Sequence, residues 1–246
     1  MSERKADGAS APGLSRRAEY AEATRHAAVD AARRLFAEKG YFATTVNEIA
    51  TEARVSPATV YAVNGGKQGL LRALIDHWSI APEVAEATDH IQNLDEPAEI
   101  LRYLTAMTRR MREDYGDIMR VVIAAAPHDQ TAAEGLALGT RRYRAGDAIA
   151  ARRLAELGAL RDGIDADAAL DIIWFYLGYA GFFTLVDENK WSYPKAQDWL
   201  CQAVSHALLK PTNTTQRHSA GAEANGPKTR VKRPRATLRG KTIRPD

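Results

Sequence analysis

The sequence predicts an all-α protein, and three observations support this fold class. From about residue 16 to residue 210, apolar residues recur at helical spacing and almost nowhere with the period of two that marks a strand. Residues typical of helix ends interrupt that spacing, such as Gly40 after one helical stretch and Ser56-Pro57 before another. The chain of 246 residues with 45% apolar content is also long enough to bury a core.

The first part of the chain predicts four helices separated by short turns. The first has an apolar face and ends at Gly40. Thr45, with Glu48 three residues later, has the sequence of a capping box and begins the second helix. Ser56 can cap the third helix, and Pro57 suits its first turn because a missing N–H costs nothing there. The fourth helix carries the apolar stripe Leu70, Leu71, Leu74, Ile75 and Trp78.

The third helix is too short to be stable alone, so we expect it to act through its exposed side. Val60 and Val63 turn inward, which leaves Thr59 and Tyr61 nearer to solvent. A short helix, a three-residue turn and a second short helix form the layout of a helix-turn-helix, whose last helix enters the major groove of DNA.

The stretch AARRLFAEKGYFATTVNEIATEARVSPATVYAVNGGKQGLLRALIDHW resembles the N-terminal domain of TetR-family transcriptional regulators. The resemblance rests on the run LF…GY..TTV..IA..A.VS..T.Y…..K..L, found here between Leu35 and Leu70. The chain departs from the family pattern at two places. Arg54 stands in the turn where the family usually carries Gly, and the family's aromatic or His positions after the Tyr are Ala62, Val63 and Asn64.

The segment Gly65-Gly66-Lys67 suits a DNA phosphate better than a nucleotide. A P-loop needs a Gly separated from its Gly-Lys by four residues and a Ser or Thr after it, whereas this chain has Tyr61 and Gln68 there. The segment offers a helix N-terminus beside a cation, which fits a phosphate next to the groove.

The resemblance implies two groups of DNA-contacting residues. Lys67 would hold the phosphate backbone, Tyr61 would reach a phosphate through its hydroxyl, and Thr45 would anchor the second helix. The base edges would be read by hydroxyl, amide and methyl contacts from Asn47, Ser56, Pro57, Ala58 and Thr59. At this point the alternative that Ser56 and Thr45 serve only as helix caps stays open.

The rest of the chain up to Lys210 is predicted to be a helical bundle that does not itself bind DNA, because acids exceed bases 20 to 14 from Ser79 onward. The resemblance implies a small-molecule pocket in this bundle, since TetR-family proteins bind effectors there. Met and aromatic side chains adapt to apolar ligands, although ordinary core packing is an alternative for each of them. The expected lining residues are Tyr103, Met107, Tyr115 and Trp174. The predicted helices are 100–111, 118–126 ended by Pro127, 131–157, 172–186 and 194–209.

The run from Ile172 to Val186 is apolar all round, so it needs cover from its own core on one side and from a partner subunit on the other. Its 15 residues are fewer than the roughly 20 that a bilayer needs, so we expect no membrane span. TetR-like proteins dimerise through their last two long helices, which implies a homodimer. The expected interface residues are Trp174, Gly178, Gly181, Phe182, Trp199 and Val204.

Composition argues against several other classes of protein. The one cysteine, Cys201, rules out an internal disulfide and is interpreted as a small core residue rather than a thiol sensor. The six histidines include no pair at i,i+4 spacing, and neither Gly-x-Ser-x-Gly nor His-Glu-x-x-His occurs. We therefore expect no enzyme, no metal and no cofactor. The polar start MSERKADGAS lacks the apolar core of a signal peptide, so a cytoplasmic location is expected.

These patterns divide the chain into four predicted segments. They are a flexible arm (1–18), a helix-turn-helix domain (19–79, motif at about 45–64), a ligand-binding and dimerisation domain (80–210) and a disordered basic tail (211–246). The tail holds nine Lys/Arg and two acids. The predicted function is a ligand-responsive transcriptional regulator, a repressor that binds palindromic operator DNA as a dimer and is released by a small molecule. The alternative is a helical sensor or interaction protein that has lost specific DNA binding.

Overall fold

The computed structural model describes residues 16–79 and 89–211. Within these two ranges the regular secondary structure is helical, apart from one isolated antiparallel bridge between Leu160 and Leu209. The predicted all-α class is therefore confirmed. Most of the predicted arm (1–18) and of the predicted basic tail (211–246) lies outside the described residues.

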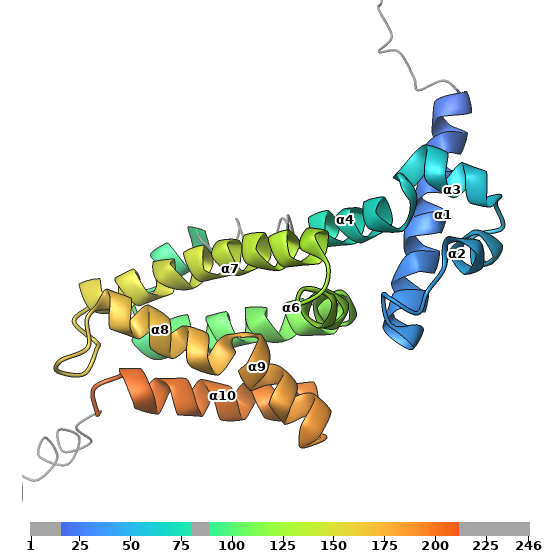
Figure 1. Ribbon diagram of the computed structural model, residues 1–246. Helices are drawn as coiled ribbons and strands as arrows, with labels where there is room; N and C mark the ends of the chain where they lie inside the picture. Colours follow the sequence, from blue (N-terminus) through green and yellow to red (C-terminus); the bar gives the residue numbers. More distant parts are fainter. Residues whose placement is uncertain (1–15, 80–88, 212–246) are drawn as a thin grey trace, which may run out of the picture. The chain divides into compact units, whose positions relative to one another are not determined.

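The N-terminal helices begin and end where the local sequence predicted (Figure 1). Thr45 begins α2 with a complete capping box, in which its hydroxyl accepts a hydrogen bond from the Glu48 N–H and the Glu48 carboxylate accepts one from the Thr45 N–H. Ser56 caps α3 by accepting a hydrogen bond from the Thr59 N–H at 3.1 Å. The four helices are α1 (Arg16–Lys39), α2 (Val46–Glu52), α3 (Pro57–Asn64) and α4 (Gly66–Ser79).

One apolar core joins these four helices. Each contributes fully or almost fully buried side chains, among them Phe36, Ile49, Val60, Leu70 and Leu74. Val60 is the one fully buried residue of the eight in α3, so this short helix is held by one side and presents the other to solvent.

Arg54, in the turn between α2 and α3, adopts the left-handed backbone conformation with φ of 58°. This conformation costs a residue with a Cβ roughly 1–2 kcal/mol, whereas Gly adopts it readily. The departure from the family pattern at this position therefore leaves the turn intact and stores strain in it.

The C-terminal helices differ from the prediction at two places. The first is α6, a single helix of 29 residues where two helices were predicted. The prediction of two helices was wrong, because the buried stripe continues from Met111 through Ile118 and Val122 within one helix. The helices are α6 (Pro97–Ala125), α7 (Gln130–Glu156), α8 (Ala166–Leu177), α9 (Tyr179–Phe183), the π-helix η1 (Thr184–Glu188) and α10 (Tyr193–Leu208).

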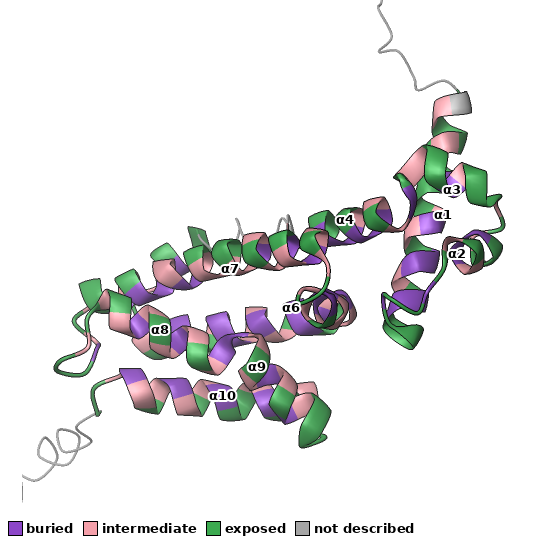
Figure 2. Cartoon of the chain, in the orientation of Figure 1, coloured by how far each residue is buried: buried purple, intermediate pink, exposed green. Residues whose placement is uncertain are grey.

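The second difference is the break at Gly178, which divides the apolar run that was predicted to be one helix. Gly178 has an extended ψ of 179°, and a Cβ on it would come within 2.5 Å of the Trp174 carbonyl oxygen. By length and composition alone the segment Ala166–Glu188 could cross a membrane, but one such segment is weak evidence, because core helices of soluble proteins pass the same test. Here α8 packs against α7 and α10, and 33% of the most apolar stretch of this segment is buried within the chain (Figure 2).

Two glycines of α7 allow α4 to lie directly against it. A Cβ on Gly135 would come within 2.4 Å of the Ile75 side chain, and a Cβ on Gly139 within 2.6 Å of the Trp78 ring. Contacts this short do not occur between real side chains, so Ile75 and Trp78 occupy the space that larger residues on α7 would fill. This contact ties the end of the helix-turn-helix region to the bundle.

A second contact joins α1 to α6. The Arg33 guanidinium donates two hydrogen bonds to the Asp117 carboxylate, at 2.6 and 2.8 Å. This two-point geometry is the stronger form of an arginine–carboxylate pair, and both side chains are about one third exposed. The described residues up to Lys210 belong to one compact unit.

The strain at Arg54 leads to a stability prediction. We expect Arg54→Gly to raise the free energy of unfolding by about 0.5–1 kcal/mol, because relief of the left-handed conformation outweighs the greater freedom of Gly in the unfolded chain. Urea unfolding of the full chain measures this. Arg54→Ala is the matched control, since it keeps a Cβ and should give no gain; a gain equal to that of Gly would contradict the strain argument.

Candidate functional site

The residues predicted to contact DNA gather on α2, α3 and the start of α4. Ser56, Pro57 and Ala58 are exposed at the start of α3, and Tyr61 is 60% exposed one turn later. Thr45 and Asn47 are exposed at the start of α2, while Thr59 is half-buried. The exposed side of α3 therefore presents hydroxyl and methyl groups, and the helix carries no charged residue.

The hydroxyl groups of Ser56, Thr59 and Thr45 on this surface already have partners within the protein. Ser56 Oγ lies 2.8 Å from Thr59 Oγ1 and accepts from the Thr59 N–H. Thr45 Oγ1 donates to the Glu48 carboxylate at 2.9 Å. Both residues act as helix caps in the free chain. A hydroxyl that caps through one lone pair can still face a base edge, so their role in reading DNA stays a prediction.

Lys67, the residue predicted to hold a DNA phosphate, makes several contacts within the protein. Its Nζ donates hydrogen bonds to the carbonyl oxygens of Thr44 at 2.9 Å and Phe42 at 3.3 Å, and it lies 4.4 Å from the centre of the Tyr41 ring. Burial lowers the pKa of Lys67, with Asp129 acting in the opposite direction. Lys67 therefore fastens the loop between α1 and α2 to α4, a structural role that the sequence pattern did not reveal.

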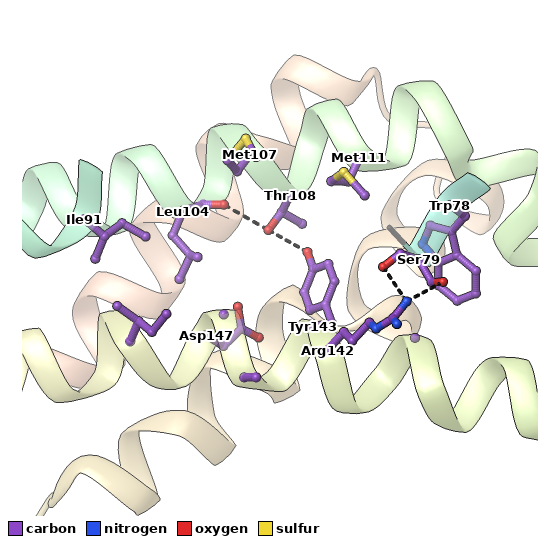
Figure 3. A pocket seen from close by; sticks show the side chains of 14 residues that line it. Trp78, Ser79, Ile91, Leu104, Met107, Thr108, Met111, Arg142, Tyr143 and Asp147 are labelled. Carbon is purple, nitrogen blue, oxygen red and sulfur yellow. Dashed lines mark hydrogen bonds between the residues drawn. The ribbon is translucent and has the colours of Figure 1, made fainter. Parts of the chain in front are cut away.

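A cavity of about 320 Å³ lies between α4, α6 and α7 (Figure 3). Trp78 and Ser79 from the end of α4 form part of its wall. The side chains around it are mostly apolar, which suits a small organic molecule. Its other lining residues are Ile91, Leu104, Met107, Thr108, Met111, Gly139, Arg142, Tyr143, Ala145, Gly146, Asp147 and Ile149.

Of the four residues predicted to line a pocket, the structure places Met107 on this cavity and the other three elsewhere. Tyr103 stacks on His90, with 4.3 Å between ring centres, in a separate depression beside α10. Tyr115 packs edge-on against His77. Trp174 packs on Tyr143 and Tyr179, one layer behind the cavity.

Asp147 is the most unusual residue of the cavity wall, because it is an acid with 2% exposure. Its Oδ2 has no hydrogen-bond partner among the described residues. Burial raises the pKa of Asp147 to about 7, although Arg112 and Arg144 act to lower it. The sequence held a signal for this residue, since Asp147 stands in the helical row Tyr143, Asp147, Ala150, Leu154, where the other members are suited to a core.

Arg112 of α6 is a second charged residue inside the bundle and is 0% exposed. Its Nη2 donates to the Leu177 carbonyl oxygen at 3.1 Å, and Nη1 lies 3.4 Å from the Met119 sulfur. Its guanidinium carbon lies 5.0, 5.1 and 5.6 Å from the ring centres of Tyr143, Tyr179 and Phe183. These aromatic faces offset part of the cost of burying the cation.

Comparison with known proteins identifies the family. Residues 28–74 match the family model for bacterial regulatory proteins of the tetR family. The matched segment contains α2, α3 and most of α4, including the exposed side of α3 described above.

The chain is a TetR-family transcriptional regulator. It is 45% identical over 62 residues to the HTH-type transcriptional regulator YvkB of Bacillus subtilis (strain 168), a match that covers 25% of this chain and 33% of YvkB. It is 28% identical over 160 residues to YdeS of the same organism, covering 62% of this chain and 75% of YdeS. The structure of a SmeT–triclosan complex has the same fold, with a TM-score of 0.63 and 19% identity over 77% of this chain and 93% of that chain.

The family match bears out the DNA-binding helix-turn-helix, and the SmeT structure shows that the C-terminal part has the fold of a TetR-like bundle. The family consists of regulators rather than enzymes, which agrees with the expectation from the sequence. The mostly apolar lining and the volume of the cavity beside α4 suit a small molecule.

Asp147 leads to a prediction on stability and pH. An aspartate has a pKa of about 3.9 in an unfolded chain, whereas burial raises that of folded Asp147 to about 7. The contribution of Asp147 to the free energy of unfolding is therefore most favourable below about pH 4 and decreases as the pH rises to 7. We expect Asp147→Asn to be more stable than the parent chain at pH 8, by up to about 4 kcal/mol, and the difference to vanish towards pH 4. Urea unfolding across this pH range measures it.

The matched control is Asp162→Asn, which removes an exposed acid in the turn between α7 and α8. It should show no comparable gain between pH 4 and 8. A pH-independent difference between Asp147→Asn and the parent chain would contradict the argument from burial.

Proposed function

We propose that the chain is a ligand-responsive repressor that binds palindromic double-stranded operator DNA as a homodimer and is released by a small molecule. The observation that carries this proposal is the position of α4. Its N-terminus follows α3 directly after Gly65, and Trp78 near its C-terminus lines the cavity. An occupant of the cavity therefore touches the helix that directly follows α3, where most of the predicted base-reading residues lie. Such a regulator acts on chromosomal DNA, so we place it in the cytoplasm.

The proposed mechanism is a two-state one. The empty protein holds the α3 helices of the dimer at operator spacing, about 34–36 Å apart for one turn of B-DNA. A ligand that favours a different position of α4 lowers the DNA affinity by its differential binding free energy for the two states. Because Ile75 and Trp78 are packed against Gly135 and Gly139 without spare room, a displaced Trp78 moves α4 as a body.

The proposed dimer interface is formed by α8 and α10, with Phe175 and Trp199 at its centre. Phe175 is 75% exposed and Trp199 is 46% exposed, which are large apolar surfaces to leave in water. Among the residues expected at the interface, Trp174 and Gly181 are half-buried, whereas Phe182 and Val204 are fully buried in the subunit's own core and Gly178 is buried at the helix break. The exposed aromatic pair is therefore the better candidate.

An alternative function is a helical sensor that no longer reads DNA. The observation that favours it is the surface of α3, where the hydroxyls of Ser56 and Thr59 bond each other and no basic residue is present. A mobility-shift assay with the promoter DNA of the protein's own gene separates the two functions. A specific complex supports the repressor, and no complex at low salt supports the sensor.

The DNA-binding surface leads to a prediction on specificity. We expect Thr59→Ala to change the ranking of operator variants, because Thr59 would contact base edges. We expect Lys67→Ala to weaken binding to all variants by a similar factor, because a phosphate contact carries no base information. Fluorescence anisotropy with a set of single-base operator variants measures both effects.

Thermal melting of both variants is the control, because Lys67 also bonds the carbonyls of Thr44 and Phe42. If both variants are folded and bind every operator like the parent chain, the assignment of DNA contacts to this surface is wrong.

The proposed interface leads to a prediction on assembly. We expect Trp199→Glu to weaken the dimer by about 2 kcal/mol or more, roughly 30-fold in the dissociation constant, as for a central aromatic anchor. Sedimentation equilibrium measures this, with Glu134→Lys on α7 as a surface control. A substitution at Gly181 would not test the interface, since its Cβ would meet the Tyr176 carbonyl oxygen at 2.5 Å within the same chain. A monomeric parent chain would refute the dimer.

A further inference from the structure

The cavity beside α4 is lined by one acidic residue, Asp147, with a buried carboxyl oxygen that accepts no hydrogen bond from the described residues. Figure 3 shows the Asp147 carboxyl pointing from α7 towards α6, into the space that the lining residues enclose. Asp147 is 2% exposed, and its Oδ2 has no partner among the described residues. A carboxylate oxygen without a donor is unfavourable inside a protein, and a ligand that donated a hydrogen bond to it would relieve that cost.

The other polar groups on the cavity wall bond one another. The Tyr143 hydroxyl donates to Thr108 Oγ1 at 3.0 Å, and Thr108 donates in turn to the Leu104 carbonyl oxygen at 2.9 Å. Arg142 Nη1 donates to the carbonyl and hydroxyl oxygens of Ser79, at 3.1 and 2.9 Å. These groups bond one another across the wall. Asp147 is therefore the residue of the wall to which a ligand could donate a hydrogen bond.

The two arginines that act electrostatically on Asp147 form their hydrogen bonds with other groups. Arg144 bonds the Asp171 carboxylate at 2.6 Å on the outer side of α7. Arg112 directs its guanidinium to the Leu177 carbonyl and to three aromatic rings, and it is not among the residues lining the cavity. Neither arginine forms a hydrogen bond with Asp147 among the described contacts.

We propose that the effector is a small apolar amine whose protonated nitrogen binds the Asp147 carboxylate while its apolar body lies against Met107, Met111 and Trp78. This inference rests on the proposed function, because it names the ligand class of the same cavity. The volume of about 320 Å³ is at the lower end of the range for small-molecule sites, roughly 300–1,000 Å³. The thioether and indole groups suit an apolar or aromatic body. An anionic ligand is disfavoured wherever Asp147 is ionised, because it would lie beside a buried carboxylate.

The proposal gives amine binding a characteristic pH dependence. Burial raises the pKa of Asp147 to about 7, so much of the free protein carries a protonated Asp147 at neutral pH. The amine binds the ionised form, so binding releases a proton and strengthens as pH rises through 7. The charged and titratable groups that act on Asp147 or are acted on by it are Arg112 of α6, Arg144 and Tyr143 of α7, and Tyr179 of α9.

The test uses three probes that share one apolar body: 4-phenylbutylamine, 4-phenylbutan-1-ol and 4-phenylbutanoate. Isothermal titration calorimetry at pH 8, where Asp147 is mostly ionised, measures their binding to the full chain. We expect the amine to bind at least about tenfold more tightly than the alcohol, and the acid to bind most weakly, as expected for a charge-assisted bond in a buried site. In Asp147→Asn the preference for the amine over the alcohol should disappear, and in the surface control Asp162→Asn it should persist.

A second measurement needs no variant. Between pH 6 and pH 8 the affinity of the parent chain for the amine should rise by about tenfold, and that for the alcohol should stay constant. Equal binding of amine and alcohol, tightest binding of the acid, a preference for the amine that survives in Asp147→Asn, or an amine affinity independent of pH would each overturn the proposal.

A mobility-shift assay with the same amine separates this inference from the proposed function. If the amine binds as expected but does not release the promoter DNA, the ligand class stands and the proposed regulation fails. If the protein binds promoter DNA specifically but shows no preference for the amine, the proposed DNA-binding function stands and the ligand class is wrong.

Discussion

The close contact between α4 and α7 is the constraint on which the rest of the structure depends. It exists because Gly135 and Gly139 leave room for Ile75 and Trp78, and a single added Cβ at either glycine would overlap these side chains. Protein interiors are packed as densely as organic crystals, so such a contact has discrete arrangements rather than a continuous range. Helix α4, which directly follows α3, is thus connected to the bundle through a contact that lies beside the cavity.

The polar groups buried near this contact lower the stability of the bundle. Asp147 and Arg112 are both inside the core, and each has an atom without a hydrogen-bond partner among the described residues. An apolar residue at either position would pack with less loss of hydration free energy. Places where a sequence departs from the rules of stable packing are often functional sites, and here the departure coincides with the wall of a cavity next to α4.

Local signals made the helix-turn-helix region predictable, whereas the bundle and the site depended on contacts between distant residues. The caps at Thr45 and Ser56 involve partners three residues away, so the sequence reveals them directly. The ammonium of Lys67 bonds carbonyls more than twenty residues earlier, so no local pattern reveals its structural role. Tyr103, Tyr115 and Trp174 have the composition expected of a pocket, but the rotation of each helix turns them away from this cavity, and residue type alone does not determine that rotation.

A ligand can shift an equilibrium only by the difference between its affinities for the two states. A molecule that touched α6 alone would be bound equally well whatever the position of α4, and it would regulate nothing. The cavity avoids this outcome, because its wall includes Trp78 from α4 and Asp147 from α7, the two helices whose contact at Gly139 would have to change. An amine bound to the Asp147 carboxylate on α7 has a fixed position relative to Gly139 on the same helix. The contact of its apolar end with Trp78 therefore depends on where α4 lies. A ligand that bonds Asp147 on α7 and packs against Trp78 on α4 would therefore bind with different affinity when α4 changes position, which is what regulation requires.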